Sequence, residues 1–321
     1  MPNLLVEIGN TALKAAWSEG LTLGKTFRYQ GERMFDYVYS LVEKEKPAVM
    51  VISSTVEISA GTEGNLRSKC GELIIIDRNH TGIFNEYDVP AYLSPDRLAS
   101  VIAARYLFKE KGSVVFDFGT TLTIDVIEAD GRYSGGNVSP GFRTRFKSLA
   151  RYSRTLPIVD TPKEIKRLGD SLKSSIESGV VSGIMFEIQG YISLFPEKMI
   201  VFTGGDALYF AKRMKNSIFA VCNLVLMGLA LIADKYYVKR KVELDTPFSG
   251  AVVLCAPFER SERGLQCLHT VLHVRNRRDF EAGDILQQDH GWCGVGHARQ
   301  EEHQHSQSCL CHREGGEVFH G

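Results

Sequence analysis

One pattern that occurs twice constrains the fold more than any other feature of the sequence. An apolar segment at 4–8 leads into Gly9-Asn10-Thr11 and is followed by a second apolar segment at 13–17. The same order returns at 114–127, where the polar turn between the segments reads Gly119-Thr120-Thr121. Short apolar segments that flank a glycine-containing turn are typical of β-hairpins. The chain is therefore predicted to contain two similar α/β units, each beginning with a hairpin.

The length of the chain fits two such units and a tail. Its 321 residues correspond to about two domains at roughly 100 to 200 residues each. A helix predicted from Ser94 to about Lys109 ends near Gly112, so we expect an N-terminal lobe at 1–112 and a C-terminal lobe at 113–241. The remaining segment, 242–321, has no lysine but holds eight of the nine histidines and five of the seven cysteines. We interpret it as an atypical tail with little stable structure.

A metal site is the functional alternative for this tail. Histidine and cysteine side chains are the usual zinc ligands, but the paired C-x-x-C motifs of zinc knuckles are missing from the sequence. Zinc is therefore the less favoured interpretation. The candidate ligands are Cys293, His297, His303, His305, Cys309, Cys311 and His312.

The composition argues against two classes of partner. Lys and Arg together number 38, as do Asp and Glu, so no overall basic field exists to attract nucleic acid or an acidic membrane surface. The apolar run at 218–233 is shorter than the roughly 20 residues of a membrane helix and predicts a buried core helix. Before the tail only Cys70 and Cys222 occur, which fits a reducing compartment, and we expect a cytoplasmic protein.

The two predicted turns carry residue types from which a nucleotide phosphate site can be built. Glycine lets backbone N–H groups approach phosphate oxygens, hydroxyls add donors, and an acid on the preceding strand can hold a cation. Either turn alone is an ordinary hairpin, whereas two together favour a phosphate site across a cleft. A loop at 204–206, between a strand and a helix, would be a third element for the nucleoside. The candidates are Glu7, Gly9, Asn10, Thr11 and Lys14 in the first turn, and Asp117, Gly119, Thr120, Thr121 and Thr123 in the second.

Five short motifs in the same order resemble the type III pantothenate kinases, in the superfamily that also holds actin, hexokinase and acetate kinase. The family's phosphate motifs, D-x-G-N-T-x-x-K and D-x-G-T-x-x-T, are similar to 7–14 and 117–123. Its G-x-D-R pantothenate motif resembles 94–97, with the upstream tyrosine at Tyr87. Two further signatures resemble 135–141 and 203–207, and the resemblance covers about Leu4 to Tyr237. It implies two actin/hexokinase-like, ribonuclease H-like lobes with a cleft between them.

The resemblance also implies an activity: ATP-dependent phosphorylation of pantothenate to 4'-phosphopantothenate, the first step of coenzyme A biosynthesis. Asp96 would be the general base toward the primary hydroxyl, and the forked guanidinium of Arg97 would pair with the substrate carboxylate. Asp117 would hold a monovalent cation, K⁺ or NH₄⁺, and Glu7 would hold Mg²⁺ directly or through water. The other implied contacts are Tyr87, Ser94, Pro95 and Leu172 for pantothenate, and Gly9, Asn10, Thr11, Lys14, Gly119, Thr120, Thr123, Gly204 and Gly205 for ATP.

Three departures from the family pattern leave other functions open. Glu7 stands where the family has Asp, Ser94 where it has Gly, and Leu172 where it has a Thr that the other subunit of a homodimer donates. The resemblance implies a homodimer for this chain too. One alternative is a catalytically silent or regulatory binding protein of the same fold, which the three departures support. Another is phosphorylation of a different small alcohol or acid, because a fold does not fix a substrate.

Overall fold

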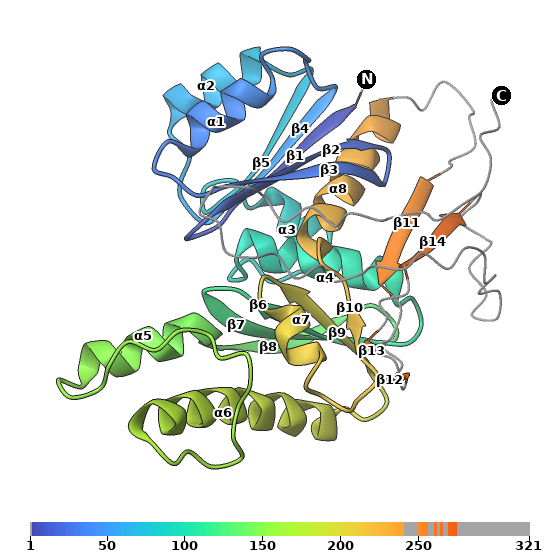
Figure 1. Ribbon diagram of the computed structural model, residues 1–321. Coiled ribbons are helices and arrows are strands. Elements are labelled where there is room, and N and C mark those ends of the chain that lie inside the picture. The colour runs from blue at the N-terminus through green and yellow to red at the C-terminus, as the bar shows by residue number, and fades with distance from the viewer. Residues whose placement is uncertain (1, 241–249, 256–259, 262–263, 266–268, 275–321) are drawn as a thin grey trace, which may run out of the picture.

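Two five-stranded mixed sheets organise the computed structural model, which describes residues 2–240, 250–255, 260–261, 264–265 and 269–274 (Figure 1). The first sheet has the order β3-β2-β1-β4-β5 and the second the order β10-β9-β6-β7-β8. The strands of the first sheet are β1 (Asn3–Ile8), β2 (Leu13–Glu19), β3 (Thr22–Tyr29), β4 (Val49–Ser54) and β5 (Glu72–Ile76). Those of the second are β6 (Ser113–Phe118), β7 (Thr121–Ile127), β8 (Tyr133–Pro140), β9 (Met199–Gly204) and β10 (Phe219–Ala220).

The two sheets share one topology. In the first, β1 pairs antiparallel with β2 and parallel with β4. In the second, β6 pairs antiparallel with β7 and parallel with β9. Glu7 on β1 and Asp117 on β6 therefore occupy equivalent places, one residue before the last of their strands. The predicted repeat of α/β architecture is confirmed.

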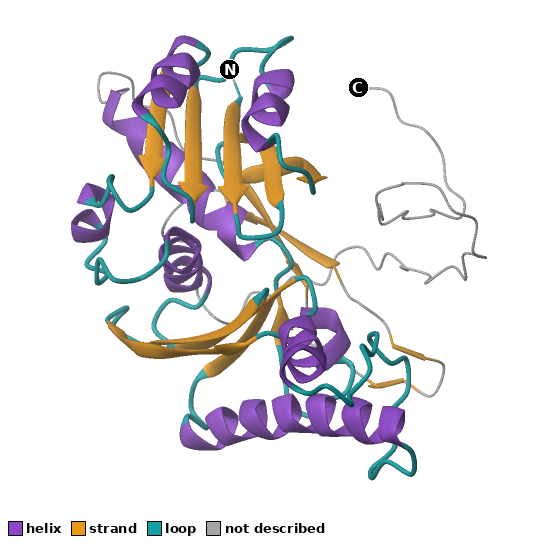
Figure 2. Cartoon of the chain, turned by 90° about the vertical axis from the view of Figure 1, so that its left-hand side faces the viewer, coloured by secondary structure: helices purple, strands orange, loops and turns teal. Residues whose placement is uncertain are grey.

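Eight helices in the described part of the chain cover and separate the sheets (Figures 1 and 2). α1 and α2 lie over the outer face of the first sheet, and α5 and α6 over the outer face of the second. α4 and α8 lie between the sheets. The helices are α1 (Met34–Leu41), α2 (Ala60–Ser68), α3 (Gly82–Glu86), α4 (Pro95–Leu107), α5 (Phe142–Tyr152), α6 (Leu172–Leu194), α7 (Ala207–Ala211) and α8 (Leu224–Arg240).

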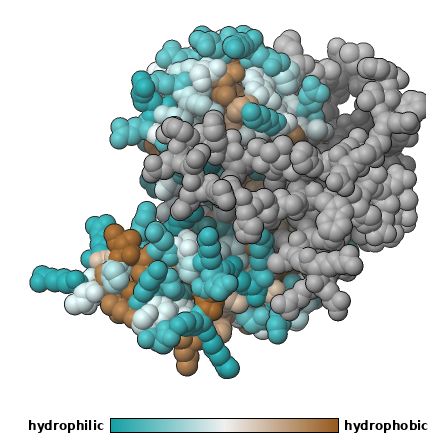
Figure 3. Space-filling view, viewed as in Figure 1, coloured by the Kyte–Doolittle hydropathy of each residue, from teal (hydrophilic) through white to brown (hydrophobic). Residues whose placement is uncertain are grey.

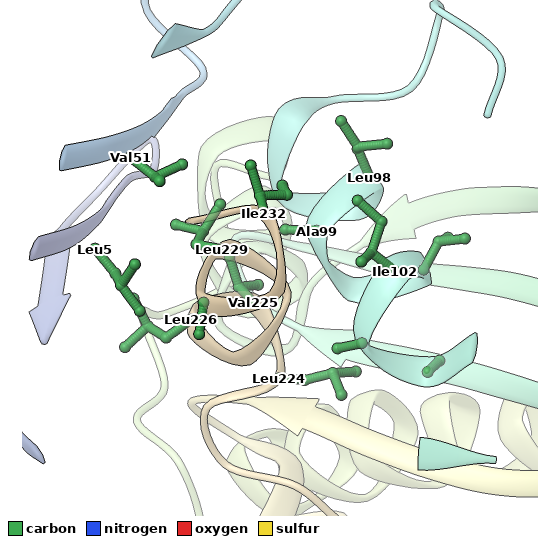
Figure 4. Close-up of a cluster of buried hydrophobic side chains, with 14 of the residues drawn as sticks. Leu5, Val51, Leu98, Ala99, Ile102, Leu224, Val225, Leu226, Leu229 and Ile232 are labelled. Carbon is green, nitrogen blue, oxygen red and sulfur yellow. The ribbon is translucent and has the colours of Figure 1, made fainter. Parts of the chain in front are cut away.

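The core between the sheets consists of α4 and α8 packed against each other and against the first sheet (Figure 4). Leu226 and Leu229 of α8 are fully buried beside Leu5 of β1, while Ala99 of α4 faces α8. α8 buries apolar side chains on most of its faces, so the predicted buried core helix is confirmed from Leu224 onward, whereas Phe219 and Ala220 form the strand β10. Among the described residues, no helix combines the length and apolar character needed to cross a bilayer.

One strand of the first sheet, β3, is absent from the predictions made from the sequence. β3 was not predicted because its side chains are mostly exposed and its pattern carries little apolar alternation.

The predicted boundary near Gly112 does not separate all contacts of the two lobes. α8 comes after this boundary in the sequence, yet it packs on β1 and β4 of the first sheet, so the lobe limits stay a prediction. In the tail, the structure describes β11 (Gly250–Cys255) paired with β14 (His269–Val274) and β12 (Arg260–Ser261) paired with β13 (Gly264–Leu265). The rest of 242–321, including the candidate zinc ligands, lies outside the described residues.

Candidate active site

A cavity of about 330 Å³ lies between the two predicted hairpins. A backbone hydrogen bond of 3.0 Å closes each turn, from the Gly9 N–H to the Ala12 carbonyl in the first and from the Gly119 N–H to the Thr121 carbonyl in the second. The second turn is one residue shorter than the first. The tips approach each other, with 3.5 Å between the hydroxyl oxygens of Thr11 and Thr120. The structure brings these predicted residues together around the cavity: Glu7, Gly9, Asn10, Thr11, Lys14, Asp96, Asp117, Gly119, Thr120, Thr121, Thr123, Gly204 and Gly205.

An ion pair occupies the first hairpin. Glu7 and Lys14 face each other across β1 and β2, and the ammonium nitrogen lies 3.1 and 3.2 Å from the two carboxylate oxygens. Burial raises the pKa of Glu7 and outweighs the lowering effect of Lys14. Burial alone would lower the pKa of Lys14, but the charges of Glu7 and Asp117 raise it above its ordinary value. Lys14 therefore stays cationic at the cavity, where it can meet phosphate oxygens.

Asp117 lies opposite this pair on the second sheet and packs against the backbone at Gly204. A Cβ atom at Gly204 would collide with Asp117 Oδ1 and would lie 2.6 Å from the Phe118 nitrogen, and Gly204 has φ +90°. Glycine is required here by both space and backbone conformation. Burial raises the pKa of Asp117 to about 7. The residue is thus a carboxylate whose charge a bound cation would stabilise.

The pKa of Asp117 predicts a pH dependence of stability. Because the folded-state pKa of about 7 exceeds the ordinary 3.8, the unfolded chain releases this proton first, and the native state loses stability as pH rises from about 4 to about 7. Asp117→Asn removes this loss, so its free energy of unfolding relative to wild type should increase with pH by at most about 1.4 kcal/mol per unit. Urea unfolding without nucleotide, over that pH range, measures the difference. Parallel pH profiles would contradict the assignment.

Asp96 brings a carboxylate to the cavity from the start of α4. It occupies the first turn of α4, after Ser94 as N-cap and Pro95 at the first helical position. The positive end of a helix dipole stabilises a carboxylate placed there. Asp96 Oδ1 is buried and has no hydrogen-bond partner among the described residues. Since buried polar atoms in proteins are almost always paired, this oxygen points to a missing ligand donor.

The remaining predicted substrate residues lie outside the cavity lining. Arg97 is buried in a pair with Asp125 instead of facing the cleft with a free fork. Tyr87 ends α3, and the Lys235 ammonium lies 4.2 Å from its ring centroid. Leu172 begins α6 and is 54% exposed. Ser94 and Pro95 lie at the start of α4, directly before Asp96.

Several lining residues were missed by the sequence analysis. Arg28 comes from the unpredicted strand β3, and Arg143 and Lys147 come from the first turns of α5. Arg143 lies 3.8 Å from Asp206, so the two reach toward each other beside the loop at 204–206. The four-residue spacing of Arg143 and Lys147 on a helix was the available signal. With Lys14, these cations give the cavity basic groups that can bind the oxygens of a polyphosphate, beside the carboxylates of the same lining.

The acidic residues of the cavity fit a magnesium–nucleotide complex better than a bare metal site. In the described part of the chain, no three His, Cys, Asp or Glu side chains cluster closely enough to enclose a metal ion. Glu7, Asp96 and Asp117 nevertheless line the same cavity. Mg²⁺ commonly uses one or two carboxylates and completes its coordination with water and phosphate oxygens. The donor set therefore fits Mg²⁺ that arrives with a nucleotide.

Comparison with known proteins gives one consistent family. A model of the family "type III pantothenate kinase" matches residues 3–194. The type III pantothenate kinase of Christiangramia forsetii is 35% identical over 238 residues, covering 72% of this chain and 98% of the relative. That of Phocaeicola vulgatus is 36% identical over 236 residues, covering 71% and 96%. That of Azobacteroides pseudotrichonymphae is 32% identical over 244 residues, covering 74% and 99%.

Solved structures were also found. The activator of 2-hydroxyisocaproyl-CoA dehydratase from Clostridium difficile is 11% identical with a TM-score of 0.48, covering 77% of this chain and 99% of that one. The ROK hexokinase of Thermus thermophilus is 14% identical with a TM-score of 0.42, covering 72% and 98%. The family match and the curated relatives, which extend over most of the described chain, decide the assignment. The chain belongs to the type III pantothenate kinase family.

Proposed function

We propose that the protein transfers the γ-phosphoryl group of ATP to the primary hydroxyl of pantothenate, giving 4'-phosphopantothenate and ADP. Membership of the family supports this activity over a silent binding role. The observation that carries the proposal is the buried, unpartnered Oδ1 of Asp96, which belongs to the same cavity as both hairpins. This oxygen is free to accept a hydrogen bond from the hydroxyl of an acceptor bound in the cavity.

We assign different steps of the phosphoryl transfer to different residues of the cavity. Asp96 accepts the proton of the acceptor hydroxyl as the oxygen of that hydroxyl bonds to the γ-phosphorus of ATP. The bond between the γ-phosphorus and the oxygen of the β-phosphate breaks, and ADP leaves with that oxygen. Lys14 and the backbone of both hairpins bind phosphate oxygens. When bound, Mg²⁺ neutralises charge on the nucleotide phosphates. Glu7 is the proposed carboxylate for Mg²⁺, directly or through water, and Asp117 for K⁺ or NH₄⁺.

A homodimer is the proposed assembly. Leu172 points into solvent at the start of α6 and can line a pantothenate site only if that site belongs to another copy of the chain. Apolar side chains gather over the end of the molecule formed by α5 and α6 (Figure 3). Their exposure exceeds half of the side chain at Tyr152, Ile158, Leu168, Leu172, Phe186 and Leu194. An exposed apolar surface of this kind is typical of a subunit interface.

Phe186→Asp is expected to dissociate this dimer. Phe186 is 75% exposed on α6, and Cβ atoms at Gly183 and Gly190 on the same helix would meet open space, which leaves room for a partner to approach. A charge buried at such a contact would have no partner. Sedimentation velocity should show wild type as a dimer and the variant as a monomer. Val56→Asp, which changes an exposed apolar residue of the first lobe, is the control, and dissociation by both changes would contradict the assignment of the surface.

The test of the activity is pantothenate-dependent formation of ADP by the full chain. The assay contains ATP and Mg²⁺, with K⁺ or NH₄⁺ added or replaced by Na⁺, and mass spectrometry identifies the phosphorylated product. We expect ADP to form only when pantothenate is present, and faster with K⁺ or NH₄⁺. ATP binding without turnover would favour the silent binding protein. Turnover with another small alcohol or acid, but none with pantothenate, would favour a different substrate.

A further inference from the structure

The guanidinium fork of Arg97 is already occupied in this structure. Arg97 Nε donates to both oxygens of Asp125, at 3.2 Å to Oδ1 and 3.1 Å to Oδ2, and Nη2 donates to Oδ1 at 2.6 Å. Nη2 also donates to the Tyr133 hydroxyl at 3.1 Å, and that hydroxyl donates to Asp125 Oδ1 at 2.8 Å. The three side chains form a closed hydrogen-bonded triad. The expectation that the forked Nε and Nη2 groups of Arg97 bind a substrate carboxylate therefore has to change, because Asp125 already occupies both groups.

The triad joins elements from both units and leaves its members little freedom. Arg97 comes from α4, Asp125 from β7 and Tyr133 from the first residue of β8. Arg97 is 8% exposed and Asp125 only 1%. The backbone of β8 closes the remaining side, because a Cβ atom at Gly136 would lie 2.7 Å from both Arg97 Nη2 and Asp125 Oδ1. A buried cation held by a buried anion in this way is fixed in one geometry.

The Nη1 edge of the Arg97 guanidinium forms no hydrogen bond with the described residues. Among the three guanidinium nitrogens of Arg97, Nη1 alone has no acceptor among the described residues, and it is not one of their fully buried unpaired atoms. Arg97 directly follows Asp96, and neighbouring residues on a helix project in different directions. An extended acceptor could thus place its hydroxyl at Asp96 and an anionic oxygen at Nη1. Pantothenate carries its primary hydroxyl and its carboxylate at opposite ends.

We propose that Asp125 and Tyr133 are positioning residues that hold Arg97 so that only its Nη1 edge meets the carboxylate of the acceptor. The inference rests on the proposed function. The charge of Asp125 offsets that of Arg97, so recognition of the carboxylate depends on the direction of the Nη1 N–H bonds and not on net charge. Loosening the triad should therefore reduce discrimination between an acceptor with a carboxylate and one without it.

The test compares pantothenate with its alcohol analogue, which has a hydroxymethyl group in place of the carboxylate. The ratio of the two kcat/KM values reports on the carboxylate alone, and a merely structural role would lower both values together. We expect the preference for pantothenate to fall about tenfold in Asp125→Asn and about fivefold in Tyr133→Phe, with the KM for ATP unchanged. Tyr191→Phe is the control, because it also removes a tyrosine hydroxyl, one that accepts a hydrogen bond from Asn137 Nδ2.

The outcomes separate this inference from the activity on which it rests. A preference that stays constant, or that increases because Asp125 competes with the acceptor for Arg97, would overturn it. If Asp125→Asn does not fold, the ratio measured for Tyr133→Phe decides alone. A wild-type chain that phosphorylates neither acceptor would overturn the proposed function as well, whereas turnover of both with unchanged ratios would overturn only the role of the triad.

Discussion

Asp96→Asn is expected to lower kcat for pantothenate phosphorylation by about 10²- to 10⁴-fold, the usual contribution of a general base. The amide keeps the shape of the side chain but cannot accept the proton of the hydroxyl. Because Oδ1 forms no hydrogen bond in the described structure, the change breaks no existing contact there, and stability should be little affected. The KM for ATP should also change little, since Lys14 and the hairpins remain. Steady-state kinetics with both substrates varied, together with thermal unfolding, measures these effects.

Asp36→Asn is the matched control for this prediction. Asp36 lies in the first turn of α1, as Asp96 lies in the first turn of α4, but the Asp36 carboxylate is exposed. The only ion pair of Asp36 among the described residues is a long one of 3.8 Å with Arg33. Its replacement should leave kcat unchanged. If Asp96→Asn retained full turnover, the proton would have to leave by another route, and the buried unpaired oxygen would need a different explanation.

The hairpins could be predicted from sequence because their determinants are local. Gly9-Asn10-Thr11 and Gly119-Thr120-Thr121 contain both the turn residues and the donors, so one short segment specifies backbone geometry and chemistry together. The helix start that places Asp96 was predicted for a similar reason, since Ser94 and Pro95 mark it locally, whereas the choice of Asp96 as the base came from the resemblance of 94–97 to a family motif. The two hairpins occupy equivalent positions in sheets of one topology, and their tips meet because of how the two sheets are placed relative to each other.

The partners of Arg97 could not be predicted, because they depend on which elements meet across the molecule. Asp125 follows Arg97 by 28 residues and lies on a strand whose alternation gives no sign that one residue faces α4. Arg28 was missed for a related reason, since β3 is a largely exposed edge strand with a weak pattern. Local sequence indicates which residues can do chemistry, and long-range packing decides which of them meet the substrate.

The packing of α4 against α8 sets the position of Asp96, and Gly228→Ala tests that dependence. A Cβ atom at Gly228 would collide with the carbonyl oxygen of Ala99 and would lie 2.5 Å from its carbonyl carbon. Both atoms belong to the backbone of α4, so no side-chain rotation relieves the collision and the helices must separate. Overpacking of this kind typically costs about 1–3 kcal/mol and can cost more. We expect a fall in the free energy of unfolding at or above the upper end of that range.

Activity should fall as well, because Asp96 lies on α4 only three residues before Ala99, and any displacement of the helix moves the base relative to the hairpins. Urea unfolding and kcat of the remaining folded protein measure the two effects. Gly64→Ala in α2 is the control: a Cβ atom there meets open space, and alanine should stabilise the helix by about 0.5–1 kcal/mol without changing kcat. A Gly228→Ala protein as stable and active as wild type would show that α4 can shift at no cost, and that the contact with α8 does not position the base.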